Sequence, residues 1–198
     1  ANASGYADEA VAELAVGLVL DLYRGITYGN EIIRKDNYPG TLPGREINGK
    51  TVGIIGTGKI GLRAAKLFKA FGANLVGYSR TKSTEAKELG IEYLSLDDLM
   101  KQSDIISLHV PLTPDTREMI SSEMIGLMKK EAIFINTARG PIVDNDALAE
   151  ALNNDRISGA GIDVFDMEPP IPSDYKLLNA KNTILTPHVA FLSSEAME

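Results

Sequence analysis

The chain contains no cysteine and no tryptophan in its 198 residues, and it has only two histidines. Without cysteine there are no disulfides and no thiolate metal sites, so no metal is expected and redox chemistry does not indicate the compartment. The longest apolar stretch, AVAELAVGLVL at residues 10–20, contains a glutamate and is too short to span a bilayer. No signal-peptide pattern opens the sequence. We therefore expect a cytoplasmic protein with no membrane attachment.

Positive charge is also scarce. Twenty basic residues face 27 acidic ones, which gives a net charge of −7 and a sequence pI near 5.0. This balance argues against nucleic acid as a partner, because phosphate backbones require a basic surface. A small anionic substrate is still compatible, since a local cationic site can exist on an acidic protein. The apolar and charged fractions, 44% and 24%, are those of a globular protein of one domain or two small ones.

The first part of the chain has helical periodicity. Apolar residues recur at helical spacing over residues 8–24, and the helix is expected to continue to about residue 35, with a bend near Gly29. Residues 37–49 are rich in proline and glycine and predict an irregular loop. The remaining residues, 50–198, form one continuous alternation of apolar runs and helical patterns.

That alternation predicts the fold class. The expected strands are Thr51–Ile55, Asn74–Tyr78, Ile105–His109, Ala132–Asn136, Gly159–Val164 and Thr183–Leu185. The expected helices are Lys59–Phe71, Leu96–Gln102, Ser122–Met128 and Asn145–Asn153. Because the strands are continuously apolar, both faces of their sheet should be covered. The sequence therefore predicts an α/β protein with a Rossmann-type, doubly wound parallel sheet in three layers, α/β/α.

The first strand leads into a glycine-rich turn, TVGIIGTGKIG, with glycines at 56, 58 and 61. This G-x-G-x-x-G spacing between a strand and a helix is typical of dinucleotide-binding domains. Gly56 permits the tight turn, Gly58 lets the backbone approach a pyrophosphate, and Gly61 lets the helix pack on the strand. The helix N-terminus then offers amides to the phosphates. The alternative interpretation is a tight turn that binds no ligand.

The end of the second strand indicates which dinucleotide is bound. A carboxylate is expected there to hold the ribose 2′-hydroxyl of NAD. This chain instead has Ser79, Arg80 and Thr81, which suit a 2′-phosphate. The hypothesis is therefore a preference for NADP over NAD. Alternatively, Arg80 stacks on the adenine and NAD is used.

Polar residues also follow the later strands. His109, Arg139, Asp163, Glu168 and His188 come at or after the ends of the third to sixth expected strands. Ligands of open parallel sheets bind beyond the carboxyl ends of the strands. A base, a carboxylate and an arginine are thus expected on the side where a nicotinamide would lie.

This set suits the reduction of a 2-oxo acid. His188 can shuttle the proton, because histidine titrates near working pH. Glu168 can fix the tautomer of the imidazole, as in a catalytic triad. Arg139 can hold the substrate carboxylate in a bidentate pair. The structural alternatives are a surface ion pair for Arg139, a solvated loop charge for Glu168 and a structural histidine at 188.

The sequence leaves two roles open for each of two further residues, His109 and Asp163. His109 is a rival catalytic base, but its context, SLHVPL, favours a structural or adenosine-side role. Asp163 either contacts the nicotinamide amide or caps the end of its strand. Ala190 and Phe191 are expected to line the nicotinamide pocket.

Taken together, these motifs resemble the D-isomer-specific 2-hydroxyacid dehydrogenases. The matching segments are VAELAVGLVLDLYR, GKTVGIIGTGKIG, SDIISLHVPLTPDT, INTARGPIVDNDALAEAL, GAGIDVFDMEPP and TPHVAF. The resemblance implies Arg139, Glu168 and His188 as the catalytic set. It also implies a homodimer formed through the cofactor domain, with the helix at residues 8–24 near the interface.

The resemblance also implies the extent of the domain and its cofactor contacts. The family has a separate substrate domain that is missing from this chain, so residues 1–198 are expected to be the dinucleotide-binding domain of a longer protein, able to bind cofactor but poorly active alone. Many members carry Asp where this chain has Ser79, which strengthens the NADP hypothesis and resembles glyoxylate or hydroxypyruvate reductases. The expected contacts to NADP or NAD are Gly56, Gly58, Lys59, Ile60, Gly61, Ser79, Arg80, Thr81, His109, Val110, Pro111, Thr116, Thr137, Ala138, Arg139, Asp163, His188 and Ala190.

The resemblance leaves two rival functions. One is a cofactor-sensing interaction module like the family's corepressors, which have the same fold as the enzymes. The other is a dehydrogenase for formate or phosphite. The presence of Arg139, Glu168 and His188 favours an enzyme, and the segment DVFDMEPP fits the 2-hydroxyacid branch better.

Overall fold

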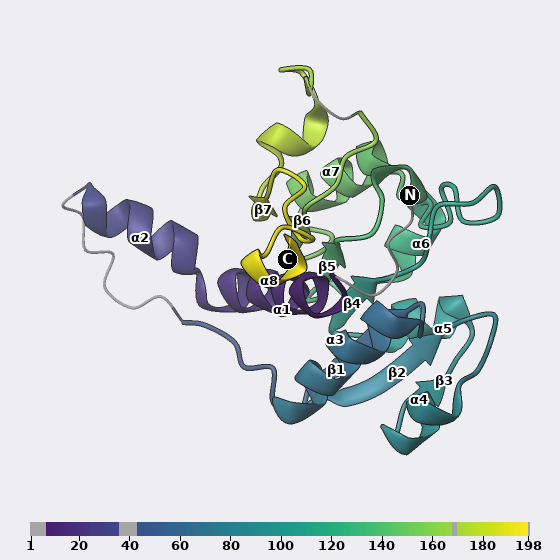
Figure 1. The fold of residues 1–198 in the computed structure, drawn as a ribbon. Helices are drawn as coiled ribbons and strands as arrows, with labels where there is room; N and C mark the ends of the chain where they lie inside the picture. Colours follow the sequence, from purple (N-terminus) through teal and green to yellow (C-terminus); the bar gives the residue numbers. More distant parts are fainter. Residues whose placement is uncertain (1–6, 36–42, 168–169, 198) are drawn as a thin grey trace.

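The structure, a computed structural model, describes residues 7–35, 43–167 and 170–197. Its centre is a seven-stranded sheet in which every strand pair is parallel, in the order β3-β2-β1-β4-β5-β6-β7 (Figure 1). The strands are β1 (Thr51–Ile55), β2 (Asn74–Tyr78), β3 (Glu92–Tyr93), β4 (Ile105–Leu108), β5 (Ile133–Asn136), β6 (Gly159–Ile162) and β7 (Thr183–Leu185). The order reverses direction between β1 and β4, where doubly wound sheets bind their ligands.

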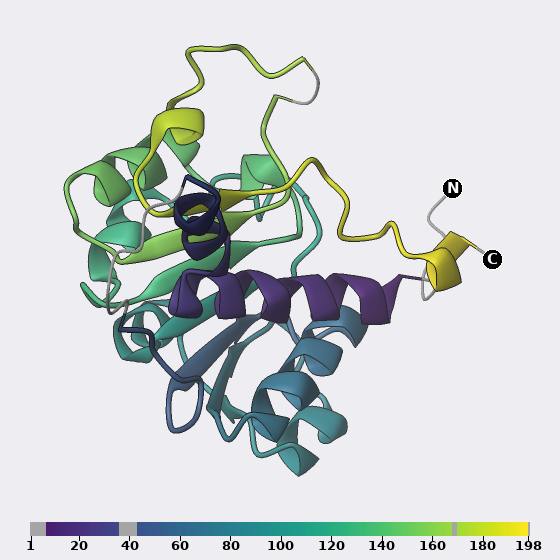
Figure 2. The same ribbon diagram turned by 90° about the vertical axis from the view of Figure 1, so that its left-hand side faces the viewer.

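Helices cover both faces of this sheet. They are α1 (Asp8–Arg24), α2 (Ile26–Arg34), α3 (Lys59–Ala70), α4 (Thr84–Glu88), α5 (Leu96–Gln102), α6 (Ser122–Leu127), α7 (Asn145–Asn153) and α8 (Ser194–Met197), with short 3-10 helices η1 (Gly140–Ile142) and η2 (Lys176–Asn179). Helix α1 packs on α3 and on β5 and β6, and it runs along one side of the sheet in Figure 2. Helices α5, α6 and α7 pack against one another on the other side.

The strands contribute side chains to a separate apolar cluster on each face. In β5, Ile133 and Ile135 join the cluster under α1 and α3, whereas Phe134 joins the one under α5, α6 and α7. All three are buried, as expected of a parallel sheet covered on both sides. The predicted α/β fold with a three-layered, doubly wound parallel sheet is confirmed.

The N-terminal helix differs from the prediction. The prediction of one helix over residues 8–35 with a bend near Gly29 is wrong, because α1 ends at Arg24 and the next residue, Gly25, adopts left-handed angles (φ 59°, ψ 42°). The Asp21 side chain then accepts a hydrogen bond from the Thr27 backbone N–H (2.8 Å), which fixes the start of α2. Gly29 lies inside α2, and its N–H donates to the Gly25 carbonyl (2.8 Å). A left-handed glycine is a common helix terminator.

Smaller differences concern the edges of elements. Four residues lie just outside the strands to which they were assigned: His109, Ala132, Asp163 and Val164. Phe71 and Met128 lie just outside their predicted helices. Strand β3 and helix α4 were not predicted, because elements of two and five residues carry too little periodicity to be recognised. Residues 43–49 form no helix or strand, in agreement with the expected loop, while residues 37–42 lie outside the described part of the chain.

Candidate cofactor-binding and active site

The glycine-rich turn between β1 and α3 requires two of its three glycines. Gly56 has a φ of +98°, and a Cβ there would lie 2.6 Å from the His109 carbonyl oxygen. A Cβ on Gly61 would lie 1.9 Å from the Gly56 carbonyl oxygen, so α3 can approach the turn only with glycine at this position. Gly58, the N-cap of α3, has nothing within 4 Å of the Cβ position. The N-terminus of α3 has no side-chain cap, which leaves its first amides available for a pyrophosphate.

A cavity of about 280 Å³ lies beside this turn, at the carboxyl ends of β1, β2 and β4. Nine of the predicted cofactor contacts line it: Gly56, Gly58, Ser79, Arg80, Thr81, His109, Val110, Pro111 and Thr116. The other residues that line it are Tyr78, Asp115 and Met119. Sequence reasoning missed these three, although Asp115 belongs to the segment PLTPDT that follows β4. The cavity lies at the point where the strand order reverses.

Tyr93, in the unpredicted strand β3, connects two loops that border this cavity. Its hydroxyl lies 2.7 Å from Thr57 Oγ1 in the glycine-rich turn, and it accepts a hydrogen bond from the Ser83 backbone N–H (3.2 Å). The Lys82 ammonium lies 5.6 Å from the centre of the Tyr93 ring. One side chain thus couples the expected pyrophosphate-binding turn to the loop after β2. No local sequence signal identified this residue.

His109 lies in the wall of the cavity. Its Nε2 lies 2.8 Å from Ser107 Oγ. Burial lowers the pKa of His109 from 6.5 to about 4, because the charged imidazolium is poorly solvated there. The ring is consequently neutral at neutral pH, which favours the structural or adenosine-side alternative.

The loop after β5 carries Arg139. The buried Asn136 side chain shapes this loop, since its Nδ2 donates to the Arg139 carbonyl (3.1 Å) and its Oδ1 accepts from the Ala138 N–H (3.0 Å). The Arg139 guanidinium is exposed and donates to the Ala138 carbonyl (2.6 Å). Thr137 Oγ1 is buried and, within the described part of the chain, has no hydrogen-bond partner. An unsatisfied buried hydroxyl is costly unless a ligand satisfies it, so this atom fits a cofactor contact.

The loops after β5 and β6 lie in close contact. A Cβ on Gly140 would lie 2.0 Å from the Phe165 carbonyl carbon and 2.2 Å from the Asp166 amide nitrogen. Asn145 in α7 also donates to the Gly140 carbonyl (3.2 Å). The Arg139 loop is therefore held directly against the segment that leads toward residue 168.

Asp163, at the end of β6, shapes the loop that carries His188. The Asp163 side chain is fully buried. Its Oδ1 accepts hydrogen bonds from Thr186 Oγ1 (2.6 Å) and the Val189 N–H (3.0 Å), and its Oδ2 accepts from the Ala190 N–H (2.9 Å). Both carboxylate oxygens thus bind the chain itself, which favours the strand-end alternative over a nicotinamide contact.

His188 itself adopts an uncommon backbone conformation. Its φ is +54°, a value that non-glycine residues rarely adopt and that the surrounding contacts must stabilise. The His188 N–H donates to the carbonyls of Asp163 (2.9 Å) and Thr186 (3.0 Å). The imidazole lies edge-to-face with the Phe191 ring, with 5.5 Å between the ring centres. Glu168, the predicted orienting carboxylate, lies outside the described residues.

The predicted residues therefore form two groups, both located at the carboxyl ends of the strands. The cavity residues follow β1, β2 and β4, whereas Arg139, Asp163 and His188 follow the neighbouring strands β5, β6 and β7. Lys59, Ile60 and Gly61 belong to the first turn of α3. A dinucleotide with its adenosine in the cavity and its pyrophosphate at the turn would direct its nicotinamide toward the second group.

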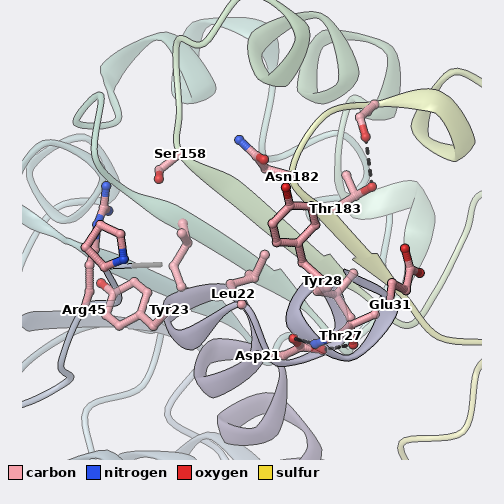
Figure 3. A pocket seen from close by; sticks show the side chains of 15 residues that line it. Asp21, Leu22, Tyr23, Thr27, Tyr28, Glu31, Arg45, Ser158, Asn182 and Thr183 are labelled. Carbon is pink, nitrogen blue, oxygen red and sulfur yellow. Dashed lines mark hydrogen bonds between the residues drawn. The ribbon is translucent and has the colours of Figure 1, made fainter. Parts of the chain in front are cut away.

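A larger cavity, of about 510 Å³, lies on the opposite side of the sheet, at the amino ends of the strands (Figure 3). Its walls include Tyr28 of α2 and residues at the amino ends of strands, such as Thr183, the first residue of β7. It is separate from the predicted cofactor contacts, none of which line it.

Residues 7–35, 43–167 and 170–197 contain no group of three or more His, Asp or Glu side chains arranged to hold a metal ion. None of their helices combines the length and the apolar character needed to cross a membrane.

Comparison with known proteins identifies the family. Residues 16–190 match the family described as D-isomer specific 2-hydroxyacid dehydrogenase, NAD binding domain. The chain is 42% identical to the glyoxylate reductase of Aeropyrum pernix, covering 98% of this chain and 60% of that protein. The crystal structure of D-lactate dehydrogenase from Aquifex aeolicus complexed with NAD and lactic acid superimposes with a TM-score of 0.91 at 38% identity, covering 98% of this chain and 63% of that one. An acyclic imino acid reductase in complex with NADPH and D-Arg gives a TM-score of 0.87 at 34% identity, covering 97% and 61%.

The chain spans about 60% of the length of the curated relatives it matches. The match to the family covers most of the chain, and the fold and the glycine-rich turn agree with it. This confirms the resemblance predicted from the sequence motifs and the prediction of a nicotinamide dinucleotide-binding domain. The chain belongs to the D-isomer specific 2-hydroxyacid dehydrogenase family, as its NAD-binding domain.

Proposed function

We propose that this protein reduces a 2-oxo acid to a D-2-hydroxy acid, and catalyses the reverse oxidation, with residues 1–198 forming its dinucleotide-binding domain. The observation that carries the proposal is the placement of the glycine-rich turn, the Arg139 loop and the His188 loop along one edge of the sheet. The similarity to the glyoxylate reductase of Aeropyrum pernix supports the same substrate class.

In this proposal each loop has one chemical task. A bound nicotinamide cofactor supplies the hydride for the carbonyl carbon. The Arg139 guanidinium holds the substrate carboxylate in two charge-assisted hydrogen bonds. The His188 imidazole donates a proton to the carbonyl oxygen in reduction and accepts it in oxidation. Glu168 orients that imidazole, and Asp163 holds the loop on which it lies.

The proposed cofactor preference is NADP over NAD. Ser79, Arg80 and Thr81 all line the cavity where the adenosine ribose is expected, and they offer hydroxyl and guanidinium donors to a 2′-phosphate. We expect NADPH to bind the full-length protein at least about tenfold more tightly than NADH, which corresponds to roughly 1.4 kcal/mol. Fluorescence titration of both reduced cofactors measures the two dissociation constants. Equal affinities would refute the preference.

Turnover by the full-length protein tests the reaction itself. NADPH and NADH oxidation is followed with glyoxylate, hydroxypyruvate, pyruvate, 2-oxoisocaproate and 3-phosphohydroxypyruvate. We expect turnover with at least one of them, and the product should be the D-hydroxy acid by chiral chromatography where it has a stereocentre. Tight cofactor binding without turnover of any 2-oxo acid would instead support the cofactor-sensing module.

We also propose that the protein is a homodimer formed through this domain. Helix α2 projects from the body of the domain (Figure 1) and has no buried residue. Its Ile26, Tyr28 and Ile33 side chains are more than half exposed, at 58%, 58% and 55%. A nine-residue helix is only marginally stable without tertiary packing, and a second copy of the domain would supply that packing. A cytoplasmic location is also proposed.

Sedimentation of the full-length protein tests the dimer. Ile33→Asp places a charge in the proposed interface and is expected to raise the dimer dissociation constant by at least about 100-fold, since an unpaired buried charge costs several kcal/mol. Leu178→Asp in η2, where the leucine is 40% exposed, serves as the matched apolar-to-acid control. A monomeric wild type, or equal effects of the two variants, would contradict the proposed interface.

A further inference from the structure

The cavity beside the glycine-rich turn contains one carboxylate and one permanent positive charge among the residues that line it. The cation is Arg80, which follows β2, and the carboxylate is Asp115, which reaches the same cavity from the segment after β4. Arg80 Nη1 lies 3.6 Å from Asp115 Oδ2. The sequence has no acidic residue at the end of β2, but the fold brings one to the same cavity from the segment after β4.

Arg80 can exchange its weak ion pair with Asp115 for a pair with another anion. The Arg80 and Asp115 side chains are 75% and 81% exposed, so water screens their attraction and the pair contributes little energy. A phosphate monoester carries up to two negative charges at neutral pH and can accept two parallel hydrogen bonds from a guanidinium. Arg80 would therefore pair with a 2′-phosphate in this cavity and no longer with Asp115.

We propose that Asp115 is a specificity-determining residue that competes with the 2′-phosphate of the cofactor for Arg80. The inference rests on the proposed binding of adenosine in this cavity. When the ribose has a 2′-hydroxyl, the Arg80–Asp115 pair stays intact. When it has a 2′-phosphate, Arg80 must leave the pair to bind the phosphate, so the attraction between Arg80 and Asp115 is lost and offsets part of the binding energy. Asp115 thus weakens the preference for NADP that Arg80 creates.

Direct binding measurements on the full-length protein test this competition. Asp115→Asn keeps the size of the side chain and removes its charge, and it is expected to lower the NADPH dissociation constant about threefold to tenfold. The NADH dissociation constant should change by less than about twofold, since no phosphate then competes for Arg80. Asp155→Asn is the matched control, because Asp155 also belongs to an exposed ion pair, with Lys181 at 3.0 Å. Asp155 lies before β6, at the amino ends of the strands and away from this cavity.

A double-mutant cycle separates competition from simple repulsion. In an Arg80→Gln background, Asp115→Asn should change NADPH affinity by less than about twofold. Asp115→Asn that leaves the ratio of the two dissociation constants unchanged, or that weakens NADPH binding, would overturn the inference. The same result in the Arg80→Gln background as in the wild type would also overturn it.

The effect of Asp115→Asn on the two dissociation constants does not depend on the proposed reaction or on the proposed preference for NADP over NAD. A wild type that prefers NADH would refute the NADP preference, yet Asp115→Asn should still shift the ratio toward NADPH. Similarly, a protein that turns over no 2-oxo acid can still show the shift. Failure of both dinucleotides to bind would overturn the inference and the proposed function together.

Discussion

Replacement of His188 with alanine in the full-length protein is expected to lower kcat for a 2-oxo acid by about 10²–10⁴-fold, the usual contribution of a general acid or base. The expected physical cause is loss of the proton donor to the carbonyl oxygen, with the dinucleotide still bound. Cofactor affinity should therefore stay within about threefold of the wild type, since the adenosine cavity lies at other strands. Steady-state turnover and NADPH titration measure the two quantities separately.

His109→Ala is the matched control for this experiment. The pKa of His109, lowered to about 4 by burial, makes this ring neutral across the pH range in which an acid–base histidine must titrate. His109 also lines the adenosine cavity, so its loss should act mainly on cofactor affinity and less on kcat. The pH dependence of kcat between pH 5 and 8 should be kept in His109→Ala. Equal losses of kcat in the two variants would refute the choice of base.

Replacement of Asp163 with alanine is expected to cost about 3–5 kcal/mol of unfolding free energy, because it leaves three hydrogen-bond donors without their buried charged partner. Those donors, at Thr186, Val189 and Ala190, flank His188 in sequence. The loop holds His188 at a φ of +54°, which the chain would not keep without these contacts. We therefore expect a loss of kcat of at least about 100-fold at a temperature where the variant is folded.

Thr186→Val provides the control for Asp163. It removes only one of the three donors and should cost about 1 kcal/mol, the net value of a single hydrogen bond. Urea unfolding gives the free energies, and turnover of folded protein gives kcat. Asp163→Asn, which keeps the shape of the side chain, separates charge from volume. Wild-type stability and kcat in Asp163→Asn would show that the buried carboxylate does not position the loop.

The fold could be predicted from the sequence, because the patterns that indicate its strands and its glycine-rich turn are local. Strands β1, β2 and β7 begin and end at the predicted residues, since each is a continuous apolar run bounded by polar or turn residues. The glycine-rich turn follows from spacing alone, because only glycine tolerates the close approaches at positions 56 and 61. The N-terminal helix was predicted to continue past residue 25 with only a bend near Gly29, whereas it breaks at Gly25, and the contact between Asp21 and Thr27 across this break joins residues six apart in the chain.

The candidate site was accessible only in part. Parallel strands bring their carboxyl ends to one edge, so the residues that follow them could be predicted as neighbours. The contacts between those residues could not, because they join segments far apart in the chain. Tyr93, which connects the turn to the loop after β2, lies 36 residues from Thr57 and in a strand too short to recognise.

The sequence by itself thus determined the fold class, the position of the dinucleotide turn and the residue types available for chemistry. The reason is that helical or strand periodicity and glycine spacing act over short stretches of chain. Only the tertiary structure decided what each polar side chain does with its hydrogen bonds. It directed Asp163 to the His188 loop rather than outward, and it brought Asp115 to Arg80 across the cavity. Such pairings depend on the packing of distant segments, which no local pattern encodes.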